Sequence, residues 1–215
     1  MSFAFPFTTC ELPRKGAAVA QPFSAAANAL TAALLFACLC RSHTWPVRAA
    51  LGSYVIFEAW HALSHARHIE GRMQTDVVHC LGYLMSATTL ACILALSGGR
   101  GAVAAMWVPL AALVLADVYV WARVRDVWTV LTGLSVFAFV FLGNLRLLPP
   151  FFRRRLAWMV PGLAALFLLF LNERANCEAM HRRAALPYHL IVELLGAALF
   201  YGLASGFLRW EAGAV

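Results

Sequence analysis

Residues 57–79, which read FEAWHALSHARHIEGRMQTDVVH, carry four histidines, two glutamates and an aspartate. Apolar sequence flanks this stretch on both sides, VRAALGSYVI over 47–56 and CLGYLMSATTLACILAL over 80–96. An ionisable group at membrane depth costs about 2.5–3.5 kcal/mol on insertion scales, so a cluster of such groups usually marks a functional site. The stretch therefore predicts two neighbouring membrane helices that carry half of a metal site.

The rest of the 215-residue chain is similarly apolar: 62% of its residues are hydrophobic, only 13% are charged, and its mean hydropathy is +0.75. A soluble domain of this size could not cover so much apolar surface. We therefore expect an integral, multi-pass membrane protein. The N-terminal sequence has no basic segment ahead of a short apolar run, so we expect no cleaved signal peptide.

The net charge of +7 does not indicate a nucleic-acid partner, because the basic residues lie at the ends of apolar runs, where bilayer-edge anchors are found. Nine of them are expected on the face of the N-terminus and eight on the other, which leaves the membrane orientation open. The six cysteines show no CxxC spacing. Buried thiols are favoured, and a disulfide between Cys10 and Cys177 stays open.

Seven apolar runs reach the roughly 20 residues that a membrane helix needs. They cover about 18–40, 47–68, 75–97, 102–122, 127–148, 156–174 and 187–208. No loop between them is long enough for a separate domain. The expected fold is all-α, a single seven-helix membrane domain over 1–215 with a short N-terminal segment at 1–17.

Because successive membrane helices alternate in direction, most polar residues of these runs fall in one layer. That layer lies just inside the face that carries the N-terminus. Its members are His61, His65, His68, Asp76, His79, Asp117, Asn172, Glu173, His189 and Glu193. The other half of the bundle has almost no ionisable residue away from its loops.

The spacing within this layer indicates a metal site. His61 and His65 follow Glu58 at the 3-and-4 spacing that aligns side chains on one helical face, and His189 and Glu193 are four residues apart. Two histidines and a carboxylate, with a fourth position open to water, form the ligand set of hydrolytic zinc sites.

Other members of the layer have simpler explanations. His68 is expected to hydrogen-bond at headgroup level. Asp117 and Glu173 are expected to cap a helix or to pair with a nearby loop arginine, Arg123 and Arg174 respectively.

Three motif regions resemble the alkaline ceramidases, which belong to the seven-helix hydrolase superfamily that also includes the adiponectin and progestin receptors. His65 precedes Asp76 by eleven residues, with Gln74 just ahead of the aspartate. The segments LNERANCEAMHRR over 171–183 and PYHLIVELLGAALFYGL over 187–203 are similar to the end of the family's sixth helix and to its seventh.

The third region is N-terminal: CELPRK over 10–15 and QPFSAAANAL over 21–30 resemble the family's acidic first segment and first helix. In that family a calcium site uses N-terminal carboxylates. Glu11 is retained here, but Gln21 and Ser24 replace stronger ligands, so we expect no calcium.

The resemblance implies a zinc ion on His65, His189 and Glu193, with Glu193 in place of the family's second helix-7 histidine. It implies that Asp76 acts as general base. The family's helix-2 serine falls at His61 here, while Ser64 is adjacent to His65, so either Ser64 or His61 would stabilise the oxyanion. In an alternative register His61 is the ligand and Phe57 takes the serine position.

The expected function is hydrolysis of a lipid amide such as ceramide, entering from the bilayer, to a sphingoid base and a fatty acid. The alternative is a seven-helix receptor or regulatory protein with a structural zinc, for which His61 would complete a closed four-ligand set. A retinal protein is excluded, since the only lysine, Lys15, lies outside the expected helices. A small transporter that relays protons through histidine and aspartate is a weaker alternative.

Overall fold

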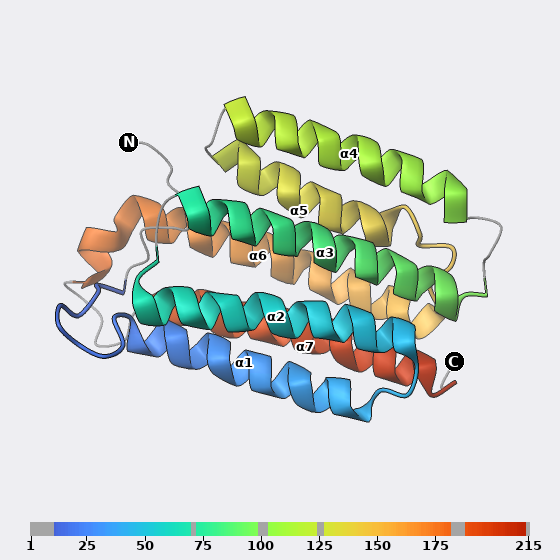
Figure 1. Cartoon of the computed structure of the whole chain (residues 1–215), viewed down its shortest axis with the longest axis horizontal. Coiled ribbons are helices and arrows are strands. Elements are labelled where there is room, and N and C mark those ends of the chain that lie inside the picture. Colours follow the sequence, from blue (N-terminus) through green and yellow to red (C-terminus); the bar gives the residue numbers. More distant parts are fainter. Residues whose placement is uncertain (1–10, 70–71, 99–102, 124–126, 182–187, 214–215) are drawn as a thin grey trace.

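The structure, a computed structural model, describes residues 11–69, 72–98, 103–123, 127–181 and 188–213. Over these residues it contains seven α-helices and no strand (Figure 1). The helices are α1 (Pro22–Arg41), α2 (Trp45–Arg67), α3 (Arg72–Leu96), α4 (Val103–Arg123), α5 (Val127–Leu142), α6 (Pro150–His181) and α7 (His189–Glu211). The all-α expectation is confirmed for this part of the chain.

The helices run back and forth along one axis, so that each is antiparallel to the next (Figure 1). α1 packs against α2 and α7, α2 also packs against α3, and α6 packs against α7. α5 lies on α3, and α4 lies outermost on α5. The ends of α2 and α6 and the starts of α1, α3 and α7 therefore share one end of the bundle.

Two helix boundaries differ clearly from the apolar runs. α5 was expected to reach residue 148 but ends at Leu142, and Asn144 turns back to donate its Nδ2–H to the carbonyl of Val140. α6 begins at Pro150, where the fixed φ of proline suits the first turn of a helix and the missing N–H costs nothing. Leu147 and Leu148 are apolar but lie in the connection between the two helices.

Within the described ranges, four helical segments are long and apolar enough to cross a membrane: Pro22–Arg41, Asp76–Leu96, Pro150–Glu173 and His189–Glu211. α5, with 16 residues, is shorter than the roughly 20 residues that a span requires. Large apolar side chains on the outer surface are widely exposed, for example Leu30 at 70% and Trp158 at 83%. Exposure of this kind is typical of a surface that meets lipid.

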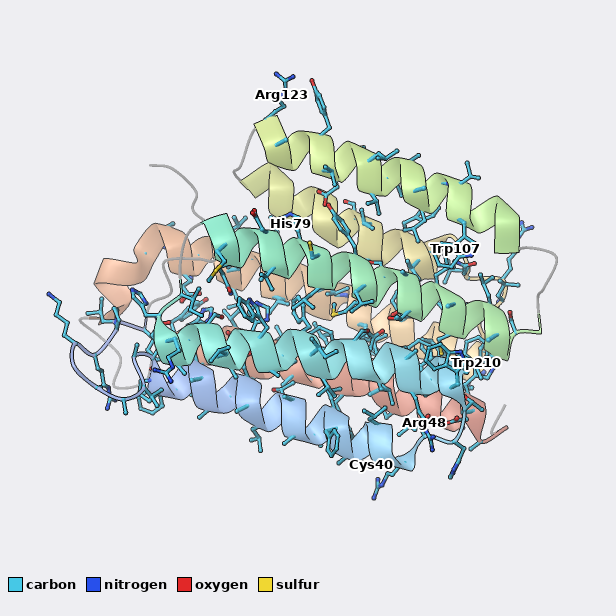
Figure 2. All side chains as sticks on the ribbon, in the orientation of Figure 1. Cys40, Arg48, His79, Trp107, Arg123 and Trp210 are labelled. Carbon is cyan, nitrogen blue, oxygen red and sulfur yellow. The ribbon has the colours of Figure 1, made fainter. Side chains whose placement is uncertain are left out.

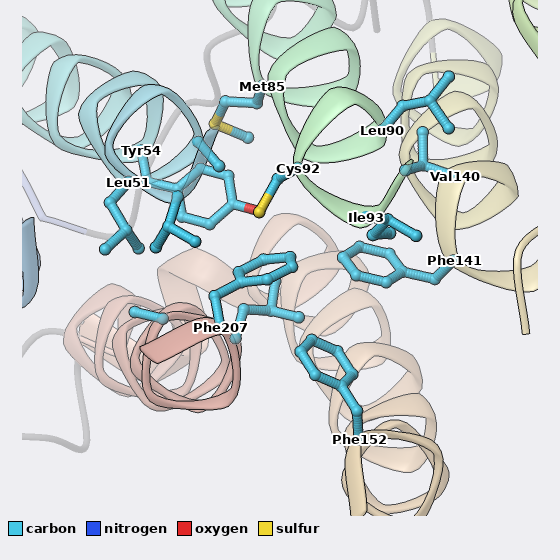
Figure 3. Packing of buried hydrophobic residues seen from close by; sticks show 14 of the residues in the cluster. Leu51, Tyr54, Met85, Leu90, Cys92, Ile93, Val140, Phe141, Phe152 and Phe207 are labelled. Atoms are coloured by element: carbon cyan, nitrogen blue, oxygen red, sulfur yellow. The ribbon is translucent and has the colours of Figure 1, made fainter. Parts of the chain in front are cut away.

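The apolar core fills the end of the bundle away from the N-terminal segment (Figure 3). Phe152 of α6 packs on Phe207 of α7, with ring centroids 5.1 Å apart. A Cβ added at Gly206 would lie 2.9 Å from the Phe152 ring, so only glycine allows this close approach. Tyr54 of α2 is fully buried and hydrogen-bonds Thr89 of α3 through its hydroxyl at 2.6 Å.

At the same end, a carboxylate of α7 binds the turn between α1 and α2. Glu211, at the end of α7, accepts hydrogen bonds from the backbone N–H groups of His43 at 2.9 Å and of Thr44. These groups precede the first turn of α2, where a negative charge is favourable because helix N–H groups lack partners there. Trp210 and Arg48 lie at this end, and Arg123 lies at the other (Figure 2).

The cysteines whose state is described are free thiols: Cys38, Cys40, Cys80 and Cys92. The expected Cys10–Cys177 pairing lies outside the described residues.

Candidate metal centre

Two histidines and a glutamate meet between α2 and α7. One ligand atom from each of His65, His189 and Glu193 lies within 4.8 Å of the other two. Glu193 Oε1 is 3.4 Å from His65 Nε2 and 2.7 Å from His189 Nε2. The two imidazole rings are 5.3 Å apart, and both histidines are buried.

The helix arrangement explains this meeting. His65 lies in the last turn of α2 and His189 is the first residue of α7, so antiparallel packing brings them to the same end of the bundle. Glu193 follows His189 by one turn, which places both side chains on one face of α7. The expected pairing of His189 and Glu193 on one helical face is therefore found in the fold, and helix packing brings His65 beside them.

Each histidine is oriented through its second ring nitrogen. Glu173, near the end of α6, accepts a hydrogen bond of 2.9 Å from His189 Nδ1, and its side chain is only 2% exposed. A carboxylate therefore lies at hydrogen-bond distance from each ring nitrogen of His189, Glu173 at Nδ1 and Glu193 at Nε2. A carboxylate behind a ligand histidine fixes the ring and raises its basicity.

His65 has an equivalent partner in Gln21, the residue before α1. His65 Nδ1 and Gln21 Oε1 are 2.8 Å apart, and both residues are buried. Sequence reasoning missed both Gln21 and Glu173 as partners of the histidines. The only available signal was the depth of Glu173, which the helix directions place in the same layer as His189.

The three groups fit a zinc ion by donor type, and one of their separations has the length expected around zinc. Zinc binds imidazole nitrogen and carboxylate oxygen at about 2.0–2.2 Å, so tetrahedral ligand atoms lie about 3.3–3.5 Å apart. The His65–Glu193 separation of 3.4 Å matches this value. The His189–Glu193 separation of 2.7 Å is that of a hydrogen bond, and this pair has to open to admit an ion.

His61 and Glu58 continue the polar stripe of α2 beyond His65. The His61 ring packs edge-on against the ring of Phe57 in its own helix, with centroids 4.4 Å apart. Glu58 is buried one turn before His61. In this structure His65, not His61, contributes the ligand nitrogen of the triad.

Ser64 connects α2 to the start of α3. Its hydroxyl donates to the carbonyl of His61 at 2.9 Å and accepts from Gln74 Nε2 at 2.8 Å. The Ser64 hydroxyl therefore uses its one proton in the bond to the His61 carbonyl of its own helix. Asp76 lies two residues after Gln74 and is half-buried, and it lies outside the three-residue ligand group.

The remaining polar residues of the layer have other roles. His68 ends α2 in the left-handed conformation, with φ of 52°. Asp117 is 1% exposed and accepts a hydrogen bond from the Tyr83 hydroxyl, while His79 projects from α3 with its ring 6.2 Å from that of Tyr83 (Figure 2). The expected polar layer therefore divides into the triad and a separate cluster between α3 and α4.

Comparison of the chain with protein-family models, with curated proteins and with solved structures gave no match.

Proposed function

We propose that this chain is a membrane-embedded, zinc-dependent hydrolase of a lipid amide, similar in activity to the alkaline ceramidases. The observation that carries the proposal is the ligand group His65, His189 and Glu193. Among the described residues it has three members, and both histidines are fixed through their second nitrogen. Catalytic zinc sites use three protein ligands and keep a fourth position for water or substrate, whereas structural sites use four.

All seven helices are proposed to span the membrane. Four have the length and composition to do so by themselves, and α2, α4 and α5 run antiparallel to their neighbours along the same axis. α2 carries charged residues such as Glu58, but Glu58 is buried and faces the polar interior. Ionisable residues in membrane helices are generally directed inward in this way.

A bound zinc ion would supply Lewis acidity and an activated water nucleophile. Asp76 is assigned as the general base that takes a proton from the attacking water and passes it to the leaving amine. The hydroxyl of the water ends on the acyl carbon, the C–N bond breaks, and a fatty acid and an amine are released. His61 stabilises the developing oxyanion, and Ser64 does so if its hydroxyl rotates away from the His61 carbonyl.

The substrate is proposed to enter sideways from the bilayer, with its acyl chain between apolar helices. The preference for an amide, and for a ceramide in particular, follows from the resemblance of the His65–Asp76 region and of α7 to the ceramidases. The products would then be a sphingoid base and a free fatty acid.

The test is release of free fatty acid from ceramides of several chain lengths by the purified protein, with zinc content measured on the same samples. We expect one zinc per chain, and loss of both zinc and hydrolysis in His189→Ala. A zinc-loaded wild-type protein that hydrolyses no lipid amide would refute the enzyme proposal and favour the receptor alternative.

A further inference from the structure

The N-terminal segment 11–21 crosses the end of α2 directly beside the metal centre. Its backbone donates from Ala20 N to the carbonyl of Ala66 at 2.9 Å and from Gln21 N to that of His65 at 3.2 Å. The last carbonyls of a helix have no partner within the helix, so these bonds complete the end of α2. His65 is thus held by this segment through its backbone as well as through its ring.

The orientation of the Gln21 amide is fixed by a second bond. Gln21 Nε2 donates to the backbone carbonyl of Glu11 at 2.6 Å, and that oxygen can only accept. The amide oxygen of Gln21 must therefore face His65 Nδ1 at 2.8 Å, where it accepts the ring proton. This leaves the Nε2 lone pair of His65 directed at the metal position.

Glu11 is itself firmly anchored. Its carboxylate accepts from Phe23 N at 2.8 Å, from Ser24 N at 2.7 Å and from Ser24 Oγ at 2.6 Å. These N–H groups belong to the first turn of α1, where a carboxylate is stabilised by the helix dipole. Glu11 is only 5% exposed, so its backbone carbonyl is a rigid support for Gln21.

We propose that Gln21 is a positioning residue for the ligand His65, with Glu11 as its anchor, so that the N-terminal segment is an integral part of the metal centre. Its consequence for zinc rests on the function proposed above. Loss of a residue that hydrogen-bonds a ligand histidine usually weakens metal binding by about 10–100-fold, and we expect a loss of this size when Gln21 is removed.

Three variants separate orientation of His65 from general support of the fold. Gln21→Leu removes the bonds to His65 and to the Glu11 carbonyl and should weaken zinc binding by about 10–100-fold. Gln21→Glu keeps an acceptor for His65 but loses the bond to the Glu11 carbonyl, so its loss of zinc affinity should be clearly smaller than that of Gln21→Leu. Glu11→Ala removes the anchor without touching a ligand, and should cause a smaller loss than Gln21→Leu.

The matched control is Thr31→Val. Thr31 is buried within α1, as Gln21 is buried just before that helix. The Thr31 hydroxyl, however, donates to the Ala27 carbonyl of its own helix and does not contact the metal centre. Zinc affinity is measured by competition with a chelator of known affinity, and thermal unfolding is recorded for every variant. Equal losses in Gln21→Leu and Gln21→Glu would overturn the proposal, because a merely structural role predicts that result.

A second measurement does not require zinc. In metal-free protein labelled with ¹⁵N-histidine, the His65 ring should show a slowly exchanging proton on Nδ1 in wild type and in Gln21→Glu, and lose it in Gln21→Leu. An unchanged His65 signal in Gln21→Leu would refute the positioning role whatever the zinc result. If the signal changes as expected but wild-type protein binds no zinc, the positioning role stands and the proposed hydrolase function fails.

Discussion

Replacing Glu173 by leucine should weaken zinc binding strongly although Glu173 is not a ligand. The substitution removes the acceptor behind His189 Nδ1 and leaves the ring free to rotate or to change the nitrogen that carries its proton. The side chain is 2% exposed, so water cannot easily take the place of the carboxylate. The effect should therefore appear in full in the metal affinity.

The magnitude follows from the bond of 2.9 Å between Glu173 and His189 Nδ1 that is lost. Loss of a partner behind a ligand histidine weakens metal binding by about 10–100-fold, which at 1.4 kcal/mol per tenfold corresponds to about 1.4–2.8 kcal/mol. Glu173→Gln keeps an acceptor oxygen and loses only the charge, so its loss should be about 2–10-fold.

The assay is competitive zinc titration in detergent, with thermal unfolding of the metal-free protein as the measure of folding. Asn176→Leu is the matched control, since it lies one turn further along α6, is exposed, and bonds only Asn172 in the same helix. If Glu173→Leu folds and binds zinc as tightly as wild type, then Glu173 does not orient a ligand, and the assignment of His189 to the metal would fail with it.

Three further substitutions test other parts of the structure. Glu193→His should retain zinc, because an imidazole replaces the carboxylate as ligand. Glu193→Ala should bind zinc much more weakly. Unchanged zinc content in the alanine variant would reassign the third ligand to His61. Asp76→Asn should keep its zinc but lower amide hydrolysis by about 10²–10⁴-fold, the usual loss without general acid–base assistance; equal hydrolysis by this variant and wild type would refute the role of Asp76. Glu211→Ala should destabilise the metal-free fold by about 0.5–1.5 kcal/mol, the usual net contribution of a hydrogen bond, with zinc affinity retained. An unchanged unfolding midpoint would show that the bonds of Glu211 to the α1–α2 turn contribute nothing.

The helices and the shared face of His189 and Glu193 were predictable from the sequence because both depend on short-range periodicity. The choice of His65 as their partner came from the resemblance to the ceramidases. Apolar runs located the seven helices, and the spacing of His189 and Glu193 placed both on one face of α7. The direction of successive helices then brought His65 to the same end. The end of α5 was missed, because Leu147 and Leu148 are apolar in sequence and the turn before Pro150 ends the helix earlier.

The residues that orient the triad could not be predicted in the same way. Gln21 contacts a histidine 44 positions later in the chain, and Glu173 reaches His189 from a different helix. Neither contact leaves a periodic pattern, and each residue lies near a helix end where polar side chains usually meet headgroups or water. For the same reason, the sequence could not show that the Ser64 hydroxyl donates to the His61 carbonyl and accepts a hydrogen bond from Gln74.

The order of the triad along the chain has a consequence for biosynthesis. His65 is made early, whereas His189 and Glu193 belong to the last helix, and α2 and α7 make few direct contacts with each other. A nascent chain that has not yet delivered its final helix holds only one of the three ligands. The chain would therefore bind its metal ion late in assembly, after α7 has been made. Truncated chains that end before α7 would lack two of the three ligands and would bind no metal at this site.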